Sequence, residues 1–248
     1  MSATGQTFFD PIADQYDALW SDTAVGAAQR AAVWRELDGL FTAGDSVLDL
    51  GCGTGLDALH LKSTGISVYG IDNSSRMVDI GRNRRVDSHH CRIEDLDLLE
   101  MQFDGAMSNF GALNCVSSLD AVACALARLV RPGGRLALCF LNRICLWEIA
   151  YYLLRANPRK AFRRLAGRAD SSLGVTVFYP SHREIKAVFK DSFRLIRFCG
   201  IGCTVPPSYV RGLGNREVEQ LSVLDKHLAD KPFFRTLADH RLYIFERL

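Results

Sequence analysis

The sequence predicts an α/β protein whose strands form a doubly wound, mostly parallel sheet. Between residues 45 and 141, short apolar runs alternate with segments of helical periodicity, which is the order that builds a parallel sheet covered by helices. The run at residues 47–50 ends in a loop with glycines at alternate positions, and a helix is expected to follow at once. In open parallel sheets, such a turn holds a ligand beyond the carboxyl end of a strand. A length of 248 residues suits one such domain with an elaboration.

The segment before the sheet is predicted to be a helical cap. Apolar side chains recur at helical spacing within residues 7–20, and a second helix is expected at 26–41. We therefore expect residues 1–43 to cover a single domain that spans residues 1–248.

Strands and helices then alternate along the chain. Ser74 suits the N-cap of a helix because its hydroxyl can accept a hydrogen bond from a free backbone N–H. The apolar runs predict strands at 45–50, 66–71, 86–91, 103–110, 135–141, 192–201 and 241–247, and the periodic segments predict helices at 55–63, after Ser74, at 118–130, within 144–168, at 181–189 and at 215–229, with an extended segment at 173–179.

The glycine-rich turn carries the strongest functional signal. Residues 47–55 read Val-Leu-Asp-Leu-Gly-Cys-Gly-Thr-Gly, and the glycines allow a sharp turn with no Cβ beside a ligand. The helix after it directs free N–H groups and a positive dipole end at that ligand. A dinucleotide fingerprint would need glycine at position 56, where this chain has Leu56. Asp49 would repel a pyrophosphate and attract an ammonium or sulfonium, so the turn favours S-adenosylmethionine (SAM) over NAD.

This stretch resembles motif I of the class I SAM-dependent methyltransferases, in particular the small-molecule enzymes of the type found in ubiquinone and menaquinone biosynthesis. Residues 71–78 resemble motif II of that family, and residues 129–136 resemble its Leu-x-Pro-Gly-Gly-x-Leu segment. The resemblance covers residues 8–142 well and the remainder by topology only. It implies a seven-stranded Rossmann-like sheet whose last strand is antiparallel and lies between strands five and six. It also implies that residues 144–180 form a helical lid inserted after strand five.

The predicted cofactor residues follow from the spacing and from this resemblance. Asp72 lies 21 residues past Gly51, the spacing at which a carboxylate accepts hydrogen bonds from ribose hydroxyls. The family pattern implies that Met77 packs on adenine and that Tyr16, in Asp14-Gln15-Tyr16-Asp17, meets the methionine end or the acceptor. Arg92 stands where relatives carry an acid. The full predicted set is Tyr16, Asp49, Gly51, Cys52, Gly53, Asp72, Asn73, Met77, Ile93, Glu94 and Asn109, with S-adenosylhomocysteine as the product of the reaction.

The end of the fourth strand is expected to face the transferable methyl group, because it lies at the switch point of the sheet. Ser108-Asn109-Phe110-Gly111 replaces the Asn/Asp-Pro-Pro-Tyr/Phe of the amino-group methylases, which disfavours a nucleobase amine as acceptor. The predicted acceptor residues are Phe110, Asn114, Trp147, Tyr151, Tyr179 and Arg183. The sequence does not identify a general base. The candidates for this role are Tyr16, Asn114 and His182.

Residues 143–168 are strongly basic. This stretch contains seven cationic residues and only one acidic residue, Glu148. The cations are Arg143, Arg155, Arg159, Lys160, Arg163, Arg164 and Arg168. The stretch fits a solvated helix face, a lid that attracts an acidic substrate, or a patch that contacts anionic lipid at a membrane periphery. Nucleic acid is disfavoured as a partner because no separate RNA-binding module is visible.

Composition narrows the class of protein further. The net charge of +2 is not that of a polyanion binder, and 48% hydrophobic residues support a sizeable core. The eight cysteines lie mostly in apolar patterns and lack the paired spacing of a zinc site. We therefore expect buried thiols, no metal and a reducing cytoplasm. No apolar run reaches the roughly 18 residues of a membrane span, and the sequence leaves a monomer and a homodimer both open.

The sequence therefore predicts a cytoplasmic enzyme that transfers a methyl group from SAM to an O, N, S or C nucleophile of a small molecule. Two alternatives stay open. The basic stretch 143–168 suits an RNA or protein methyltransferase, and a protein that binds SAM without catalysis would need only the cofactor motifs.

Overall fold

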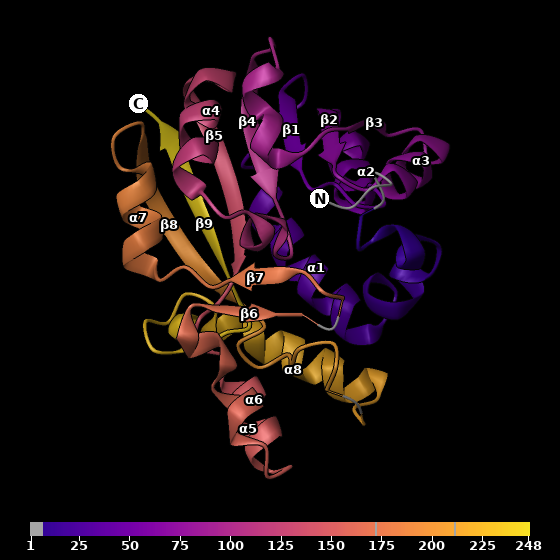
Figure 1. Cartoon of the computed structure of the whole chain (residues 1–248), viewed down its shortest axis with the longest axis vertical. Coiled ribbons are helices and arrows are strands. Elements are labelled where there is room, and N and C mark those ends of the chain that lie inside the picture. The colour runs from indigo at the N-terminus through magenta and orange to yellow at the C-terminus, as the bar shows by residue number, and fades with distance from the viewer. Residues whose placement is uncertain (1–6, 172, 211) are drawn as a thin grey trace.

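The computed structural model describes residues 7–171, 173–210 and 212–248, and its centre is a seven-stranded sheet (Figure 1). The antiparallel strand β9 pairs with both β5 and β8, while the remaining pairs are parallel, which confirms the predicted sheet. The strands in spatial order are β3 (Asp87–His90), β2 (Ser67–Asp72), β1 (Ser46–Leu50), β4 (Phe103–Ser108), β5 (Val130–Leu141), β9 (His240–Arg247) and β8 (Phe193–Ile201).

Helices cover both faces of this sheet (Figure 1). They are α1 (Ala24–Leu37), α2 (Leu56–Ser63), α3 (Ser75–Asn83), α4 (Leu119–Leu129), α5 (Leu146–Leu153), α6 (Pro158–Ala161), α7 (His182–Phe189) and α8 (Asn215–Leu228), with shorter helical turns η1 (Asp10–Gln15), η2 (Asp17–Ser21), η3 (Ile93–Leu98), η4 (Ala112–Cys115), η5 (Arg163–Ala166) and η6 (Phe234–Thr236). In the described part of the chain, no helix is long and apolar enough to cross a bilayer.

Alternation along the strands divides the core into two layers. On β1, Leu48 and Leu50 pack into one hydrophobic cluster with α4 and α7, whereas Val47 points into the cluster formed with α1 and α2. The same switch occurs on β9 between Tyr243 and Leu242. Strands that are buried on both faces read as continuous apolar runs, which is why the sequence located them.

The N-terminal segment departs from the single helix expected at residues 7–20. It forms the 3₁₀ turn η1 and then the π turn η2, because its acidic side chains are held by tertiary contacts. Asp14 forms an ion pair with Arg76, and Asp17 accepts a hydrogen bond from the Thr54 hydroxyl. Residues 1–6 of the predicted cap lie outside the described residues.

The insertion after β5 is only partly helical. Helices α5 and α6 project at the lower end of Figure 1, and the chain then returns as a hairpin of β6 (Arg168–Asp170) and β7 (Thr176–Phe178). The sequence predicted the extended segment of β7 but not β6, because Arg168 and Asp170 are charged and β6 therefore lacks the apolar residues that mark β7. Residue 172 of the predicted lid lies outside the described residues.

The cysteines are free thiols, and five of the eight are buried. Cys91 and Cys115 are half-buried and Cys124 is exposed, so the expectation of buried thiols does not hold for these positions.

Candidate active site

A cavity of about 450 Å³ lies at the carboxyl ends of β1, β2 and β4. Its floor is the glycine turn after β1, and its sides come from the end of β2, from η3 and from the segment after β4. Residues 7–9 and the turn of the β6–β7 hairpin line the opposite side. This is the switch point of the sheet, where β1 and β4 are neighbours and their connections diverge to opposite faces.

The glycine turn is shaped by packing as well as by any ligand. Gly51 has φ +73°, and a Cβ there would lie 2.3 Å from the Cβ of Ala112. At Gly55, which has φ +84°, a Cβ would lie 2.9 Å from Val86. Larger residues at these two positions would therefore push the loop away from the strands, whereas Gly53, at φ +53°, has open space beside it.

Asp72 sits at the end of β2 and faces the cavity. Its Oδ2 accepts a hydrogen bond from the Gly53 N–H at 2.9 Å, and its Oδ1 accepts one from the Ser74 N–H at 2.8 Å. Burial raises the pKa of this carboxyl, and the two backbone N–H groups oppose the shift. Each carboxylate oxygen can accept a further hydrogen bond, so the group is fixed in place and still able to bind a diol.

Four buried polar atoms in or beside the cavity wall have no hydrogen-bond partner among the described residues. One is Thr7 Oγ1, on the side formed by residues 7–9, and the other three are two acceptors, Asp49 Oδ2 and Asn109 Oδ1, and one donor, Arg30 Nε. Buried polar atoms are rarely left unpaired in folded proteins. The two acceptors and the single donor match the ammonium and carboxylate of an amino acid, so these residues fit the methionine end of SAM.

Asp57, the second residue of α2, holds two of these groups in place. Its Oδ1 accepts hydrogen bonds from Arg30 Nη1 at 2.6 Å and from Trp34 Nε1 at 2.7 Å. Its Oδ2 accepts one from Asn109 Nδ2 at 3.1 Å, which leaves the Asn109 Oδ1 free. Sequence reasoning missed Asp57 and Arg30. The signal in the sequence that could have found them was Arg30, a charged residue next to the apolar face of α1. On that face Val33 and Leu37 are fully buried.

Asp49 is 2% exposed and lies under the turn, outside the lining of the cavity. Burial raises its pKa well above the ordinary value, and the negative charges of Asp57 and Asp72 add to this effect. A nearby cation would lower that pKa again, which is the electrostatic property expected of a site for an ammonium or sulfonium.

The predicted adenine residues lie together at one end of the cavity. Met77 is buried, and Asn73, Ile93 and Glu94 join it in the lining. Arg92 also lines this end, and its guanidinium lies 3.6 Å from the Glu94 carboxylate.

Tyr16 also lines the cavity, with its ring 4.9 Å from that of Trp20. Burial raises the pKa of its phenol to about 12, so at neutral pH the hydroxyl is protonated and can donate a hydrogen bond but cannot accept a proton as a base. Asp17, the next residue, fixes this segment over the glycine turn through Thr54 and Arg84.

The other end of the cavity is apolar. Phe110 has φ +51°, and the Arg30 guanidinium lies 4.8 Å above its ring. Phe8 packs against the hairpin turn, where a Cβ on Gly174 would lie 3.2 Å from its ring. The apolar side chains of this end are Phe8, Phe9, Phe110, Val116, Leu141, Leu173, Val175 and Val177.

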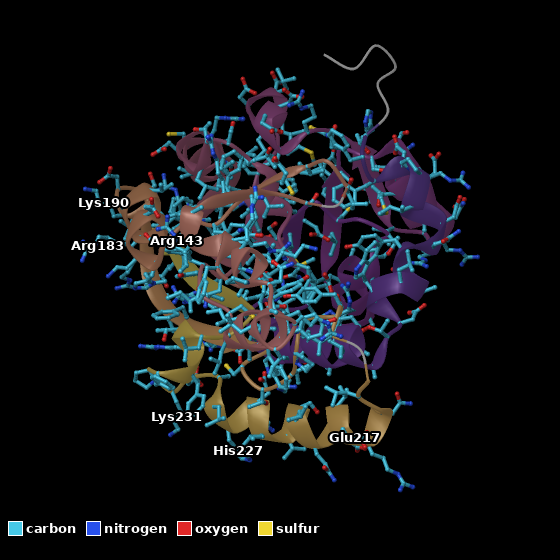
Figure 2. All side chains as sticks on the ribbon, turned by 60° about the horizontal axis from the view of Figure 1, so that its bottom comes forward. Arg143, Arg183, Lys190, Glu217, His227 and Lys231 are labelled. Carbon is cyan, nitrogen blue, oxygen red and sulfur yellow. The ribbon has the colours of Figure 1, made fainter. Side chains whose placement is uncertain are left out.

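Of the six predicted acceptor residues only Phe110 lines this cavity, and the other five, Asn114 among them, lie outside its lining. Trp147 donates a hydrogen bond to the Thr204 carbonyl, and the Tyr151 ring packs edge-on against Tyr209. Tyr179 is buried beneath the Arg164 guanidinium. Arg183 is exposed on α7 and points away from the molecule (Figure 2). The β6–β7 hairpin, which the sequence did not predict, takes the place they were expected to fill.

The other two candidates for a general base, Asn114 and His182, make contacts outside the cavity. Asn114 donates hydrogen bonds to the carbonyls of Leu141 and Phe178, and its Oδ1 accepts one from the Leu141 N–H. It therefore joins η4 to β5 and β7. His182 packs against the rings of Phe198 and Tyr243, outside the cavity.

The basic stretch contains two kinds of cation, those that pair with buried carboxylates and those that are exposed at the surface. Arg163 and Arg164 both pair with Glu148, and Arg164, which is 4% exposed, also pairs with Asp239 at the start of β9. Burial on its own would raise the pKa of Glu148, but the two guanidinium groups lower it overall. Arg164, Glu148 and Asp239 are therefore internal, Arg163 is half-buried, and together they fix the insertion to the sheet.

Comparison with known proteins gives consistent matches. The family described as "Methyltransferase domain" matches residues 47–134. A demethylmenaquinone methyltransferase of Tropheryma whipplei (strain Twist) is 41% identical over 102 residues, which cover 40% of this chain and 42% of that protein. The match therefore spans less than half the length of that relative. A demethylmenaquinone methyltransferase of Mycobacterium sp. (strain JLS) is 31% identical over 171 residues, which cover 66% of this chain and 73% of that protein.

Solved structures show the same fold. The S-adenosylmethionine dependent methyltransferase from Mesorhizobium loti aligns with a TM-score of 0.57 and 18% identity, over 92% of this chain and 99% of that one.

Proposed function

Because the chain belongs to the class I SAM-dependent methyltransferases, we propose that it transfers the methyl group of SAM to a small apolar acceptor. The first candidate is the reduced, quinol form of a quinone-type ring, which loses a proton as it gains the methyl group, since relatives that match this chain are named demethylmenaquinone methyltransferases. The nucleophilic atom is then a ring carbon or a ring oxygen, and a nitrogen or sulfur nucleophile belongs to acceptors of another class.

One observation carries this proposal. A single cavity has a polar end that complements a nucleoside and an amino acid, and an apolar end beside it. Arg30 would bind the carboxylate of SAM, Asn109 would accept a hydrogen bond from its ammonium, and Asp72 would bind its ribose, with Met77 against adenine. Asp49, beneath the turn, would attract the ammonium through its negative charge. When bound, SAM supplies an electrophilic methyl group on a sulfonium that is already a good leaving group.

The chain then has to position the acceptor and exclude water. Phe110 and Leu141 lie between the polar end and the hairpin, so an apolar ring against them would face the transferable methyl group. Tyr16 would donate a hydrogen bond to an oxygen of the acceptor or of SAM. A general base is required only if the acceptor must lose a proton in the transfer.

The alternatives have less support. Arg164 is buried and the half-buried Arg163 is paired with Glu148, so the basic surface available for RNA is smaller than the sequence suggested. A non-catalytic role would require only the polar end, and the apolar end would then have no purpose. Formation of S-adenosylhomocysteine with any acceptor would exclude that role.

Calorimetry with SAM and with S-adenosylhomocysteine tests the cofactor. We expect both to bind, and we expect Asp72→Ala to weaken binding about 100-fold, because hydrogen bonds to a charged group contribute about 1.5–3 kcal/mol each. Asp79→Ala, an exposed acid on α3 outside the cavity, is the matched control. Unchanged affinity in Asp72→Ala would remove the ribose assignment, and no binding by the wild type would remove the proposal.

Acceptors are then compared by mass spectrometry for the gain of one methyl group. We expect a reduced acceptor, demethylmenaquinol or a short-chain naphthoquinol analogue, to be methylated in preference to RNA and protein substrates. Methylation of RNA alone would replace the proposal with the first alternative.

A further inference from the structure

Helix α5 and the residues that follow α5 and α6, including η5, expose a group of large apolar side chains. They belong to the part of the insertion that projects at the lower end of Figure 1. Leu154 follows the last residue of α5 and is 88% exposed. We call this group the apolar tip, and its members are Leu146, Leu153, Leu154, Phe162 and Leu165.

Unpaired cations surround the apolar tip. Among the described residues, no carboxylate pairs with Arg155, Arg159, Lys160 or Arg168, and all four are exposed. The Arg155 guanidinium lies 3.9 Å from the centre of the Tyr151 ring, and the Lys160 ammonium lies 5.6 Å from that of Tyr152. These contacts hold the two cationic groups against aromatic rings. In the sequence, no acidic residue occurs between Arg155 and Arg168.

The chain runs without interruption from the apolar tip to the cavity. After α6 and η5 it enters β6, and the hairpin turn places Leu173 and Val175 in the apolar end of the cavity. Arg163 and Arg164 lie between the two regions and fix this segment to the sheet through Glu148 and Asp239. A surface bound at the tip is therefore connected to the apolar end of the cavity through a segment that is fixed to the sheet.

We propose that the apolar tip and its cations dock on the surface of a bilayer that contains anionic lipids. Exposed leucines and a phenylalanine gain free energy by entering the headgroup and acyl boundary, and the flanking cations attract anionic headgroups. Long basic side chains can keep their charged heads in the headgroup layer while their stems contact apolar surface. This inference deepens the proposed function and rests on it for its purpose, since an apolar acceptor dissolved in a bilayer would reach the cavity from that side.

RNA fits the same surface less well. Single-stranded nucleic acid is bound by exposed aromatic rings on which bases stack. Here Tyr151 and Tyr152 are half-buried and pack against each other and against Tyr209, while the exposed side chains are mostly aliphatic. Aliphatic exposure favours lipid over nucleic acid.

Vesicle sedimentation with the full chain tests the proposal. We expect binding to vesicles of phosphatidylcholine mixed with the anionic lipid phosphatidylglycerol, because anionic headgroups attract basic side chains, and weaker binding to phosphatidylcholine alone. Leu154→Glu should weaken binding about tenfold, because it replaces apolar burial by a charge that anionic lipid repels. Leu98→Glu, at a position that is 73% exposed on η3, is the matched control and should bind as the wild type does.

Variants that remove positive charges separate the electrostatic attraction to anionic lipid from the insertion of apolar side chains into the bilayer. Arg155→Gln with Arg159→Gln should weaken binding to the anionic vesicles about 25-fold, since each cation near such a surface contributes about fivefold. Arg183→Gln with Lys190→Gln, two exposed cations on α7 (Figure 2), should change little.

The outcomes separate this inference from the proposed function. SAM affinity, measured on every variant, reports that the fold and the cofactor end are intact. Equal sedimentation of Leu154→Glu and the wild type would overturn the docking proposal, whatever the enzyme does with SAM. Binding to RNA that is lost in the Arg155 and Arg159 variant but kept in Leu154→Glu would assign the surface to nucleic acid instead.

Discussion

The two ends of the cavity are built from different kinds of sequence. The polar end comes mainly from the turn after β1, the end of β2 and the segment after β4, and its side chains are fixed by backbone N–H groups and by Asp57. The apolar end joins residues 7–9 to the β6–β7 hairpin, more than 150 positions apart in the chain. A motif can encode the first end, whereas the second exists only when distant segments meet.

The difference also concerns charge. The polar end keeps unpaired acceptors and a donor beside the cavity, while the insertion uses its buried charges to satisfy one another around Glu148. The polar end of the cavity therefore has free polar atoms that can bind a ligand, whereas the buried charges of the insertion attach it to the sheet. Variants can test each region separately.

The largest expected effect lies in the attachment of the insertion. Arg164→Met would leave Asp239 and part of Glu148 without their buried partner, which costs about 3–5 kcal/mol when one member of a buried ion pair is removed. Chemical denaturation followed by fluorescence measures the free energy of unfolding. Arg168→Met, an exposed arginine of the same segment, should change it by less than about 0.5 kcal/mol. Equal effects in both variants would contradict the division of the basic stretch into internal and surface cations.

The next largest effect concerns the polar end. Arg30→Met should weaken SAM binding about 30- to 100-fold, because a hydrogen-bonded charge contributes about 2–3 kcal/mol, while the KM of the acceptor should stay within about twofold. Calorimetry gives the first value and steady-state kinetics the second. Arg35→Met on the same helix is exposed and outside the cavity, and it should bind SAM normally.

A pH dependence follows from Asp49. Burial raises its pKa well above the ordinary value, and a bound ammonium would lower it, so SAM binding should release a proton at pH values below the raised pKa. Affinity should therefore fall as the pH is lowered, with a limiting slope of about tenfold per pH unit. Calorimetry between pH 5 and 8 in buffers of different ionisation enthalpy tests this. Asp49→Asn should show a flatter profile, and a profile as steep as that of the wild type would exclude Asp49 as the source.

The smallest expected effect lies at the apolar end. Leu173→Ala in the hairpin turn should raise the KM of an apolar acceptor about fivefold, in keeping with the loss of about 1 kcal/mol of apolar contact. SAM affinity should not change. Leu224→Ala, an exposed leucine on α8, serves as the control in the same kinetic assay. A change in SAM affinity without a change in KM would mean that the two ends are not separate.

The sequence by itself determined the strands, the glycine turn after β1 and the acid at the end of β2, whereas the order of the strands came from the resemblance to a family. Buried parallel strands produce continuous apolar runs, and the turn after β1 needs glycine at Gly51 and Gly55 because no Cβ fits there. The position of Asp72 at the end of β2 follows from the length of one strand–helix–strand unit. These features depend on neighbours in the chain, so periodicity and spacing were enough to find them.

Only the tertiary structure decided which charges and aromatic rings have a role at the site. Arg30 meets Asp57 across 27 positions and Arg164 meets Asp239 across 75, and no local pattern marks such pairs. The same limit explains why Trp147 and Tyr151 were assigned to the acceptor and the hairpin was not. Local spacing fixes how a strand ends and a turn begins, whereas the contacts of a side chain that lies far along the chain are fixed only when the packed sheet brings it there.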